Sequence, residues 1–247
     1  SLRLGVIDDI QKLHVTTCRL GMNPRRIVYC PDGRLFAVGC IESGIQNFGL
    51  GVDESSMGNC LRFIDDTTYE DLQRVDLDPY EMVLSMVYVS LKIPSSASDT
   101  RSQDTTDANM KSFLLVGTAY VLADEDEPTR GRILVYSCQQ DEVTGSTGNS
   151  SRSVRLIAEL STEGGVYSIC QFFGGKILAT VNTRTHICQL ADDTGLLKLE
   201  YVGLGHFGHI LSLFVRSRAE RHAEKVTPEA AQGGALAMEV AENETAA

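Results

Sequence analysis

Short apolar runs separated by polar turns dominate residues 1–215 of the chain. The runs are rich in Val, Ile, Leu, Tyr and Phe and are bounded by Gly, Pro, Asp and Ser, which is typical of β-strands. No segment before about residue 209 keeps a helical apolar period over three turns. The pattern predicts an all-β fold, with strands over 26–30, 34–41, 60–65, 81–91, 113–122, 131–137, 154–160, 165–173, 176–181, 185–190, 196–202 and 209–215.

The predicted strands fall into groups of four. Residues 165–202 hold one compact group, 81–160 hold the same order with polar insertions, 26–77 hold an earlier group, and 209–215 open another. Four short strands recurring about every 40–45 residues are typical of a β-propeller blade. We therefore expect a partial β-propeller over 21–215, with about three four-stranded blades plus one strand.

Polar segments separate and follow these strands. The sequences Pro31-Asp32-Gly33, Gly174-Gly175 and Asp192-Asp193-Thr194-Gly195 favour tight turns between antiparallel strands. Insertions at 94–111 and 139–152 are rich in Ser, Thr and Asp, and the tail 216–247 is rich in Ala and Glu. Such segments bury too little apolar surface to order themselves, so we expect them to be disordered.

The formal net charge is −11 at pH 7, and this balance repels nucleic-acid phosphates. Arg25 and Arg26 are the only adjacent basic pair in the part predicted to fold, and they are interpreted as a solvated strand edge. We therefore expect any nucleic-acid contact to be indirect. No run of roughly 18 apolar residues predicts a membrane span. Because the chain begins with Ser1 rather than Met, it is expected to be a segment of a longer protein.

The seven cysteines are odd in number and form no C-x-x-C pair. Cys30, Cys40, Cys170 and Cys188 lie inside apolar runs, where they are expected to act as small buried residues in a reducing compartment. We predict no metal site and no cofactor.

The chain offers few motifs for catalysis. Residues 203–208 match G-x-G-x-x-G, but the β-rich sequence that follows favours a glycine-rich turn between blades over a dinucleotide site. His206 and His209 lack a third metal ligand and are expected to be loop histidines. The acidic run Asp124 to Glu127 is expected to be a solvated loop. No pattern assembles a nucleophile, base and oxyanion site, so we expect a protein that is not an enzyme.

Four stretches carry a family resemblance: residues 5–15, 23–29, 113–136 and 164–182. They resemble successive parts of the large subunits of damaged-DNA-binding complexes, and two of them are more loosely similar to the related subunits of the cleavage and polyadenylation and splicing machineries. The resemblance covers about residues 5–216 and implies three propellers and a helical domain in the complete protein. Residues 1–20 would then leave a preceding propeller, and the third propeller would begin near residue 21.

The resemblance also implies a role and a location. Members of the family link substrate receptors to the cullin scaffold of a RING ubiquitin ligase in the nucleus, without chemistry of their own. Their receptor-facing positions match a set of residues whose alternative role is in the blade core: Glu81, Ala119, Gly165, Val166, Tyr167, Ser168, Leu211, Leu213 and Phe214. The alternatives are an RNA-processing scaffold and a nucleotide-dependent enzyme. The tail after Arg216 departs from the family pattern.

Overall fold

The computed structural model describes residues 2–7, 13–42, 58–93, 110–140, 152–193, 196–206 and 208–215. The chain divides into a unit of Ser1–Leu213 and a second unit, Phe214–Ala247. The tail 216–247 and most of both predicted insertions lie outside the described residues, so their interpretation stays a prediction. Within the described ranges, no helix has the length and apolar character that crossing a membrane requires.

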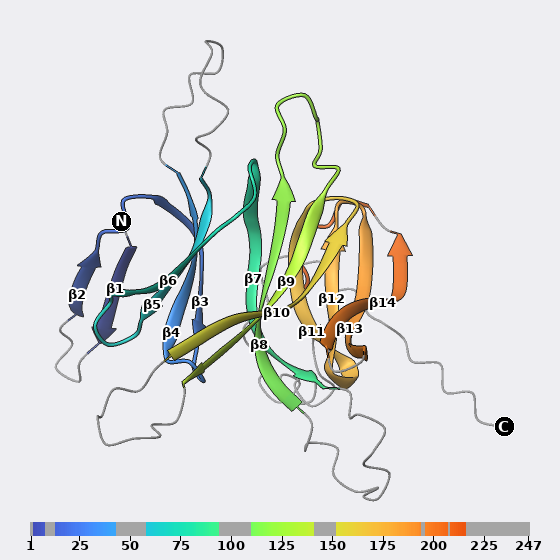
Figure 1. Ribbon diagram of the computed structural model, residues 1–247. Coiled ribbons are helices and arrows are strands. Elements are labelled where there is room, and N and C mark those ends of the chain that lie inside the picture. The colour runs from blue at the N-terminus through green and yellow to red at the C-terminus, as the bar shows by residue number, and fades with distance from the viewer. Residues whose placement is uncertain are drawn as a thin grey trace, which may run out of the picture. The chain divides into compact units, whose positions relative to one another are not determined.

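The first unit is all-β, and its described residues form three four-stranded antiparallel sheets, each with its strands in chain order (Figure 1). We call these sheets blades 1, 2 and 3. Blade 1 holds β3 (Asn23–Cys30), β4 (Leu35–Ile41), β5 (Cys60–Asp65) and β6 (Asp71–Asp76). Blade 2 holds β7 (Glu81–Lys92), β8 (Met110–Tyr120), β9 (Gly131–Gln140) and β10 (Arg152–Thr162). Blade 3 holds β11 (Val166–Phe172), β12 (Lys176–Val181), β13 (Arg184–Asp193) and β14 (Leu196–His206).

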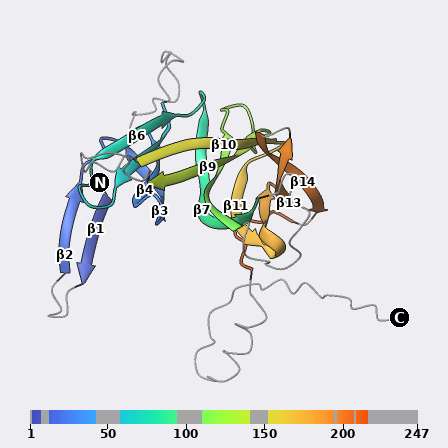
Figure 2. The same ribbon diagram turned by 60° about the horizontal axis from the view of Figure 1, so that its bottom comes forward.

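The blades adjoin through their first strands, because β7 contacts both β3 and β11 (Figures 1 and 2). Strands β1 (Leu2–Ile7) and β2 (Leu13–Cys18) pair as a separate antiparallel hairpin. The predicted partial β-propeller is therefore confirmed. The assignment of residues 1–20 to the exit of a preceding propeller stays a prediction.

Three local expectations were wrong. No strand is assigned over 209–215, where a fourth blade was expected to begin. A β-strand needs a hydrogen-bonded neighbouring strand, and none pairs with 209–215 in the part of the chain that the structure describes. Strand β6 was missing from the predicted strands because its side chains are almost all exposed, which leaves no apolar alternation to detect. The glycines of 203–206 continue β14 rather than forming a turn between blades.

The predicted turns have the expected backbone chemistry. Gly174 and Gly175 both have positive φ, and the peptide nitrogen of Lys92 lies 2.5 Å from where a Cβ on Gly175 would stand. The Arg34 amide donates to the Pro31 carbonyl at 3.0 Å, which closes the turn between β3 and β4. Thr194 and Gly195 lie outside the described residues.

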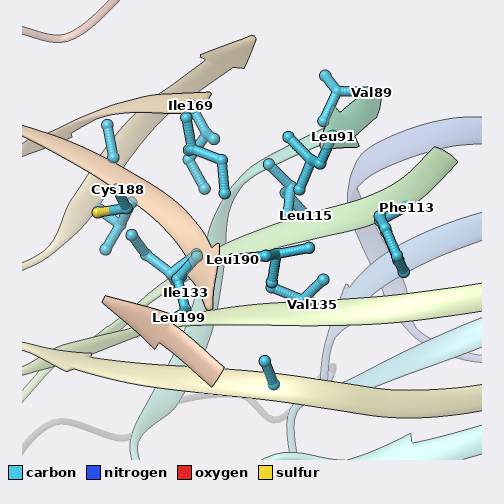
Figure 3. Close-up of a cluster of buried hydrophobic side chains, with 14 of the residues drawn as sticks. Val89, Leu91, Phe113, Leu115, Ile133, Val135, Ile169, Cys188, Leu190 and Leu199 are labelled. Carbon is cyan, nitrogen blue, oxygen red and sulfur yellow. The ribbon is translucent and has the colours of Figure 1, made fainter. Parts of the chain in front are cut away.

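Blade 2 is buried on both faces, because alternate side chains of one strand point to opposite neighbours. Phe113 and Leu115 of β8 join a core shared with blade 3 (Figure 3), whereas Leu114 and Val116 join a core shared with blade 1. This explains why β8 is a nearly continuous apolar run rather than an alternating one. The two cores hold the successive blades against each other.

His186 of β13 predicts a pH dependence of stability. It is 5% exposed, its ring stacks edge-on against Tyr201 at 4.9 Å, and neither ring nitrogen has a hydrogen-bond partner among the described residues. Burial, and then the charge of Arg184, lower the pKa of His186 in the folded chain. As the pH falls through about 6.5, His186 becomes protonated in the unfolded chain but stays neutral in the folded chain. The free energy of unfolding therefore falls.

Urea unfolding of the wild type and of His186→Phe between neutral and mildly acidic pH checks this expectation. The wild type should lose more stability than the variant across the range. An equal loss in both proteins would show that other groups cause the pH dependence.

Candidate functional site

The first strand of each blade bulges close to its beginning. The antiparallel pairing skips Arg25 in β3, Leu84 in β7 and Tyr167 in β11. A bulge bends its strand and re-aims the extra side chain. Each blade therefore presents one re-aimed side chain at the end where its first strand starts.

Hydrogen bonds join these bulges from one first strand to the next. In each case the residue that follows the skipped position uses its side chain to bind the backbone of the next segment along the chain. The three bonds are Arg26 Nε to Leu84 O (2.6 Å), Ser85 Oγ to Val166 O (2.9 Å) and Leu213 N to Ser168 Oγ (3.1 Å). The third bond holds the segment after β14 beside β11, so this segment continues the row although it forms no strand.

Two of the re-aimed side chains converge over a glycine. A Cβ placed on Gly165 would stand 3.2 Å from Cδ1 of Leu84 and 3.4 Å from Cε2 of Tyr167. The absent side chain therefore allows Leu84 and Tyr167 to approach each other. The Tyr167 ring in turn meets the ring of His209 edge-on, with centroids 5.0 Å apart. We call Leu84, Gly165, Tyr167 and His209 the bulge row.

The predicted receptor-facing residues differ in their exposure: five are at least partly accessible and four are buried. Tyr167, Ser168 and Leu213 are half-buried, and Leu211 is 66% exposed, so all four are accessible on or beside the bulge row. Phe214 belongs to the second unit and is 84% exposed. The others are buried within the blades, and these are Glu81, Ala119, Gly165 and Val166. Whether any of the nine contacts a partner stays a prediction.

The buried members lie beneath the accessible ones. Val166 and Ala119 are both 0% exposed, and the Ala119 Cβ lies 3.1 Å from the Cβ position of Gly165. Val166 is part of the core shared by blades 2 and 3. Ala119 and Val166 therefore lie in the core of the blades, which was the alternative role given for these residues. They pack beneath the bulge row and do not line its surface.

Glu81 has a structural environment. Its carboxylate is 0% exposed and is held by Arg132, with Nη2 to Oε2 at 2.5 Å and Nε to Oε1 at 2.9 Å. The Thr118 hydroxyl donates to Oε1 at 2.6 Å, and the Asp78 amide donates to Oε2 at 3.1 Å. The carboxylate is fully engaged within blade 2, so Glu81 fixes the start of β7 and thereby positions Leu84 three residues later.

Acidic groups border the bulge row. In the loop between β8 and β9, Asp124, Asp126 and Glu127 are exposed, as predicted for a solvated loop. Glu127 Oε1 lies 3.9 Å from His209 Nδ1. Burial, and then the charge of Glu127, raise the pKa of Tyr167, so its hydroxyl stays protonated and can donate a hydrogen bond. The row thus combines apolar side chains with a polar, acidic margin.

Sequence reasoning missed Leu84 and placed His209 only in a loop. A short internal repeat could have identified Leu84, because Val83-Leu84-Ser85 and Val166-Tyr167-Ser168 occupy the same bulge in β7 and β11. Ile210-Leu211-Ser212 repeats the pattern. In the structure, however, Leu211 belongs to no strand and to no bulge.

The glycine motif does not form a phosphate cradle. Such a cradle needs a loop that opens a helix, so that backbone amides converge on the anion. Gly203 and Gly205 instead lie inside β14, paired with Ile187 and Thr185 of β13, and no helix follows them in the described residues. Across the same described residues, no group of three His, Cys, Asp or Glu side chains could hold a metal ion.

Comparison with known proteins shows the family to which the chain is similar. The family model described as CPSF A subunit region matches residues 58–210. The chain is 36% identical over 220 residues to DNA damage-binding protein 1a of Arabidopsis thaliana, and 34% identical over 220 residues to DNA damage-binding protein 1b of the same plant. It is 34% identical over 221 residues to DNA damage-binding protein 1 of Solanum lycopersicum.

These matches cover 89% of this chain but 17% of each relative, so the chain spans about a sixth of their length. The matched region includes blades 2 and 3 in full and the later strands of blade 1. The likeness is therefore to one part of a DNA damage-binding protein 1. On these grounds the chain belongs to the CPSF A subunit region family.

Proposed function

We propose that the chain forms part of a non-catalytic nuclear adaptor that links substrate receptors to a cullin-RING ubiquitin ligase. The bulge row is the receptor-binding surface in this proposal. One observation carries it: successive blades each re-aim one side chain to the same end of the molecule, and two of those side chains, Leu84 and Tyr167, meet over Gly165.

The chemistry of the row suits an amphipathic helix. A helix that binds a groove inserts apolar side chains spaced one turn apart and keeps polar contacts at the margin. Leu84 and Tyr167 offer apolar surface, Tyr167 also offers a hydroxyl donor, and the acidic loop residues lie alongside. Partly buried tyrosines of this kind are frequent hot spots of protein–protein binding. The acidic margin favours a helix that carries basic residues at its edges.

Two alternatives receive less support. A nucleotide-dependent enzyme would need a phosphate-binding turn, and residues 203–206 are part of β14. An RNA-processing scaffold belongs to the same family of propellers, but DNA damage-binding proteins match over 89% of the chain. The net charge of −11 also opposes direct binding of nucleic acid by this segment, so we propose that any such contact is indirect.

A Tyr167→Ala substitution tests the proposed surface. Removing the ring deletes the apolar anchor, so receptor binding is expected to weaken by roughly 30-fold, the effect of a hot-spot truncation of about 2 kcal/mol. Phe173→Ala is the matched control, because Phe173 is 56% exposed and lies just beyond the opposite end of β11. It should leave binding unchanged.

The measurement is affinity capture of the tagged full-length protein from nuclear extract, with quantitative mass spectrometry of the recovered proteins. Cullin and substrate receptors are the expected partners, and receptors alone should be lost from Tyr167→Ala. Loss of both classes together would indicate an unfolded blade, which a melting curve by circular dichroism identifies. Recovery of polyadenylation or splicing factors instead would overturn the proposal in favour of the RNA-processing alternative.

A further inference from the structure

Four sulfur-containing side chains pack on the face of blade 1 that points away from blade 2, and these are Cys18, Met22, Cys40 and Cys60. Cys40 and Cys60 stand directly opposite each other as the last residue pair of the β4–β5 ladder. The Cys60 Sγ also lies 3.4 Å from the Sδ of Met22. Cys40 and Cys60 are 2% and 0% exposed and belong to a small core with Leu20.

The geometry of the pair permits a disulfide. Directly opposite residues of antiparallel strands have Cα atoms about 4.5 or 5.5 Å apart, and both separations lie within the disulfide range of about 4.4–6.8 Å. The pair ends its ladder, so the strands can adjust there without breaking the bonds of an interior pair. Both side chains belong to the same small core, so bond formation needs only a local movement.

A hollow of about 450 Å³ lies beside the pair. Met22, Arg62 and Arg74 are among the residues that line it. Met22 therefore touches both the hollow and the Cys60 thiol. A methionine side chain is unbranched and adaptable, so it can move aside and admit a molecule as small as hydrogen peroxide.

The surroundings also distinguish the two thiols. The hydrogen bond from Cys40, together with the charges of Arg74 and Arg62, lowers the pKa of Cys60 to about 7 against the opposing effects of burial and Asp76. The same hydrogen bond, followed by burial, raises the pKa of Cys40. Cys60 is therefore the nucleophile of the pair, because the thiolate is the reactive form of cysteine.

We propose that Cys40 and Cys60 form a peroxide-sensitive dithiol that is oxidised to an intramolecular disulfide. The Cys60 thiolate attacks one peroxide oxygen, so that an S–O bond forms, the O–O bond breaks and hydroxide leaves, taking up a proton to become water. Cys60 is then a sulfenic acid. Cys40 attacks that sulfur, the S–S bond forms, the S–O bond breaks, and a second water leaves. Two thiols and one peroxide thus give one disulfide and two waters.

The chain contains its own matched control. Cys30 and Cys138 also belong to one core, but that core is enclosed between blades 1 and 2. The hydrogen bond with Cys138, and then burial, raise the pKa of Cys30, and the nearby charge is that of Asp32. This second pair therefore lacks the arginine charges that favour the Cys60 thiolate, and it should stay reduced under the same treatment.

The experiment treats the folded full chain with hydrogen peroxide at neutral pH, blocks the remaining thiols and maps the products by mass spectrometry. Trypsin releases residues 35–62 as one peptide containing both cysteines, and cleavage after Glu42 and Glu54 then separates them unless a disulfide joins them. We expect the joined product, with a mass lower by two hydrogens. Cys60 should react at least about tenfold faster than Cys30, because the pKa of Cys60 is lowered whereas that of Cys30 is raised.

Two variants make the proposal falsifiable. In Cys40→Ser the sulfenic acid cannot be resolved, so dimedone should label Cys60. In Arg74→Ala, which alters an exposed side chain, alkylation of Cys60 should slow while the melting temperature is kept. If Cys40 and Cys60 oxidise no faster than Cys30 and Cys138, or if no joined peptide forms, the proposal is overturned.

Discussion

A Gly131→Ala variant is expected to lose at least about 3 kcal/mol of unfolding free energy, the upper range for overpacking a well-packed interior. Gly131 begins β9 at the point where three backbone segments meet. A Cβ there would stand 2.4 Å from the Gly164 carbonyl oxygen and 2.5 Å from the Thr118 carbonyl oxygen. The Thr162 hydroxyl lies 3.0 Å away.

The large effect follows from what the new methyl group would meet. A flexible side-chain end can move aside, whereas these carbonyl oxygens belong to β8 and to the connection between blades 2 and 3. The Gly164 carbonyl also accepts the Thr162 hydroxyl at 2.8 Å, and that bond would have to break or shift. The clash therefore disturbs the junction of two blades rather than one side chain.

Gly203→Ala provides the matched control within a strand. The nearest atom to its Cβ position is Cδ1 of Ile187 at 3.5 Å, which is ordinary contact. This variant should change stability by less than about 1 kcal/mol, and the reduced freedom of the unfolded chain favours a slight gain. Urea unfolding monitored by circular dichroism measures both. Equal midpoints for the two variants would contradict the packing described for Gly131.

Arg132→Met is the second substitution expected to have a large effect, with a loss of about 3–5 kcal/mol, as for other buried pairs broken by removing one partner. It leaves the Glu81 carboxylate, which is 0% exposed, without its cation. The Thr118 hydroxyl and the Asp78 amide remain as hydrogen-bond donors, but neither neutralises the charge. An uncompensated buried charge is the physical source of the loss.

A surface ion pair on blade 3 gives the control. Arg184 and Glu163 are 3.2 Å apart, with side chains 47% and 88% exposed, so Arg184→Met should cost less than about 1 kcal/mol. The double variant Glu81→Leu with Arg132→Met removes both charges and should recover part of the lost stability. If the double variant is as unstable as Arg132→Met alone, packing rather than the buried charge explains the effect.

The strands that could be predicted are those rich in apolar side chains, even where these are partly exposed, as Ile27 and Tyr29 of β3 are. The run 113–122 was identified because both faces of β8 lie in cores, so apolar residues follow one another without a break. Strand β6 was not predicted, because five of its six side chains are exposed and it has no apolar alternation. For residues 209–215 the apolar pattern is real, but a β-strand also needs a hydrogen-bonded neighbour, and the pattern cannot report whether one is present.

The candidate site, too, contains residues that the sequence could identify and residues that it could not. Tyr167 was identified through the family resemblance, whereas Leu84 was not, although the repeat of Val83-Leu84-Ser85 in 166–168 signalled an equivalent position. Glu81 was predicted to face a partner, and the structure places its carboxylate within blade 2. An acidic residue at the start of a strand looks alike in sequence whether it faces solvent or a buried arginine 51 positions away.

The sequence by itself determined that the chain is all-β, that its strands group into four-stranded blades, and which family it belongs to. These properties depend on the alternation of apolar and polar residues, on turn residues and on the order of short motifs. All of these are local features of the sequence. The tertiary structure alone decided which side chains meet: Leu84 and Tyr167 over Gly165, Glu81 with Arg132, and Cys40 with Cys60 beside a hollow. Such meetings depend on strand register, bulges and the packing of one blade on another, which bring together residues far apart in the sequence.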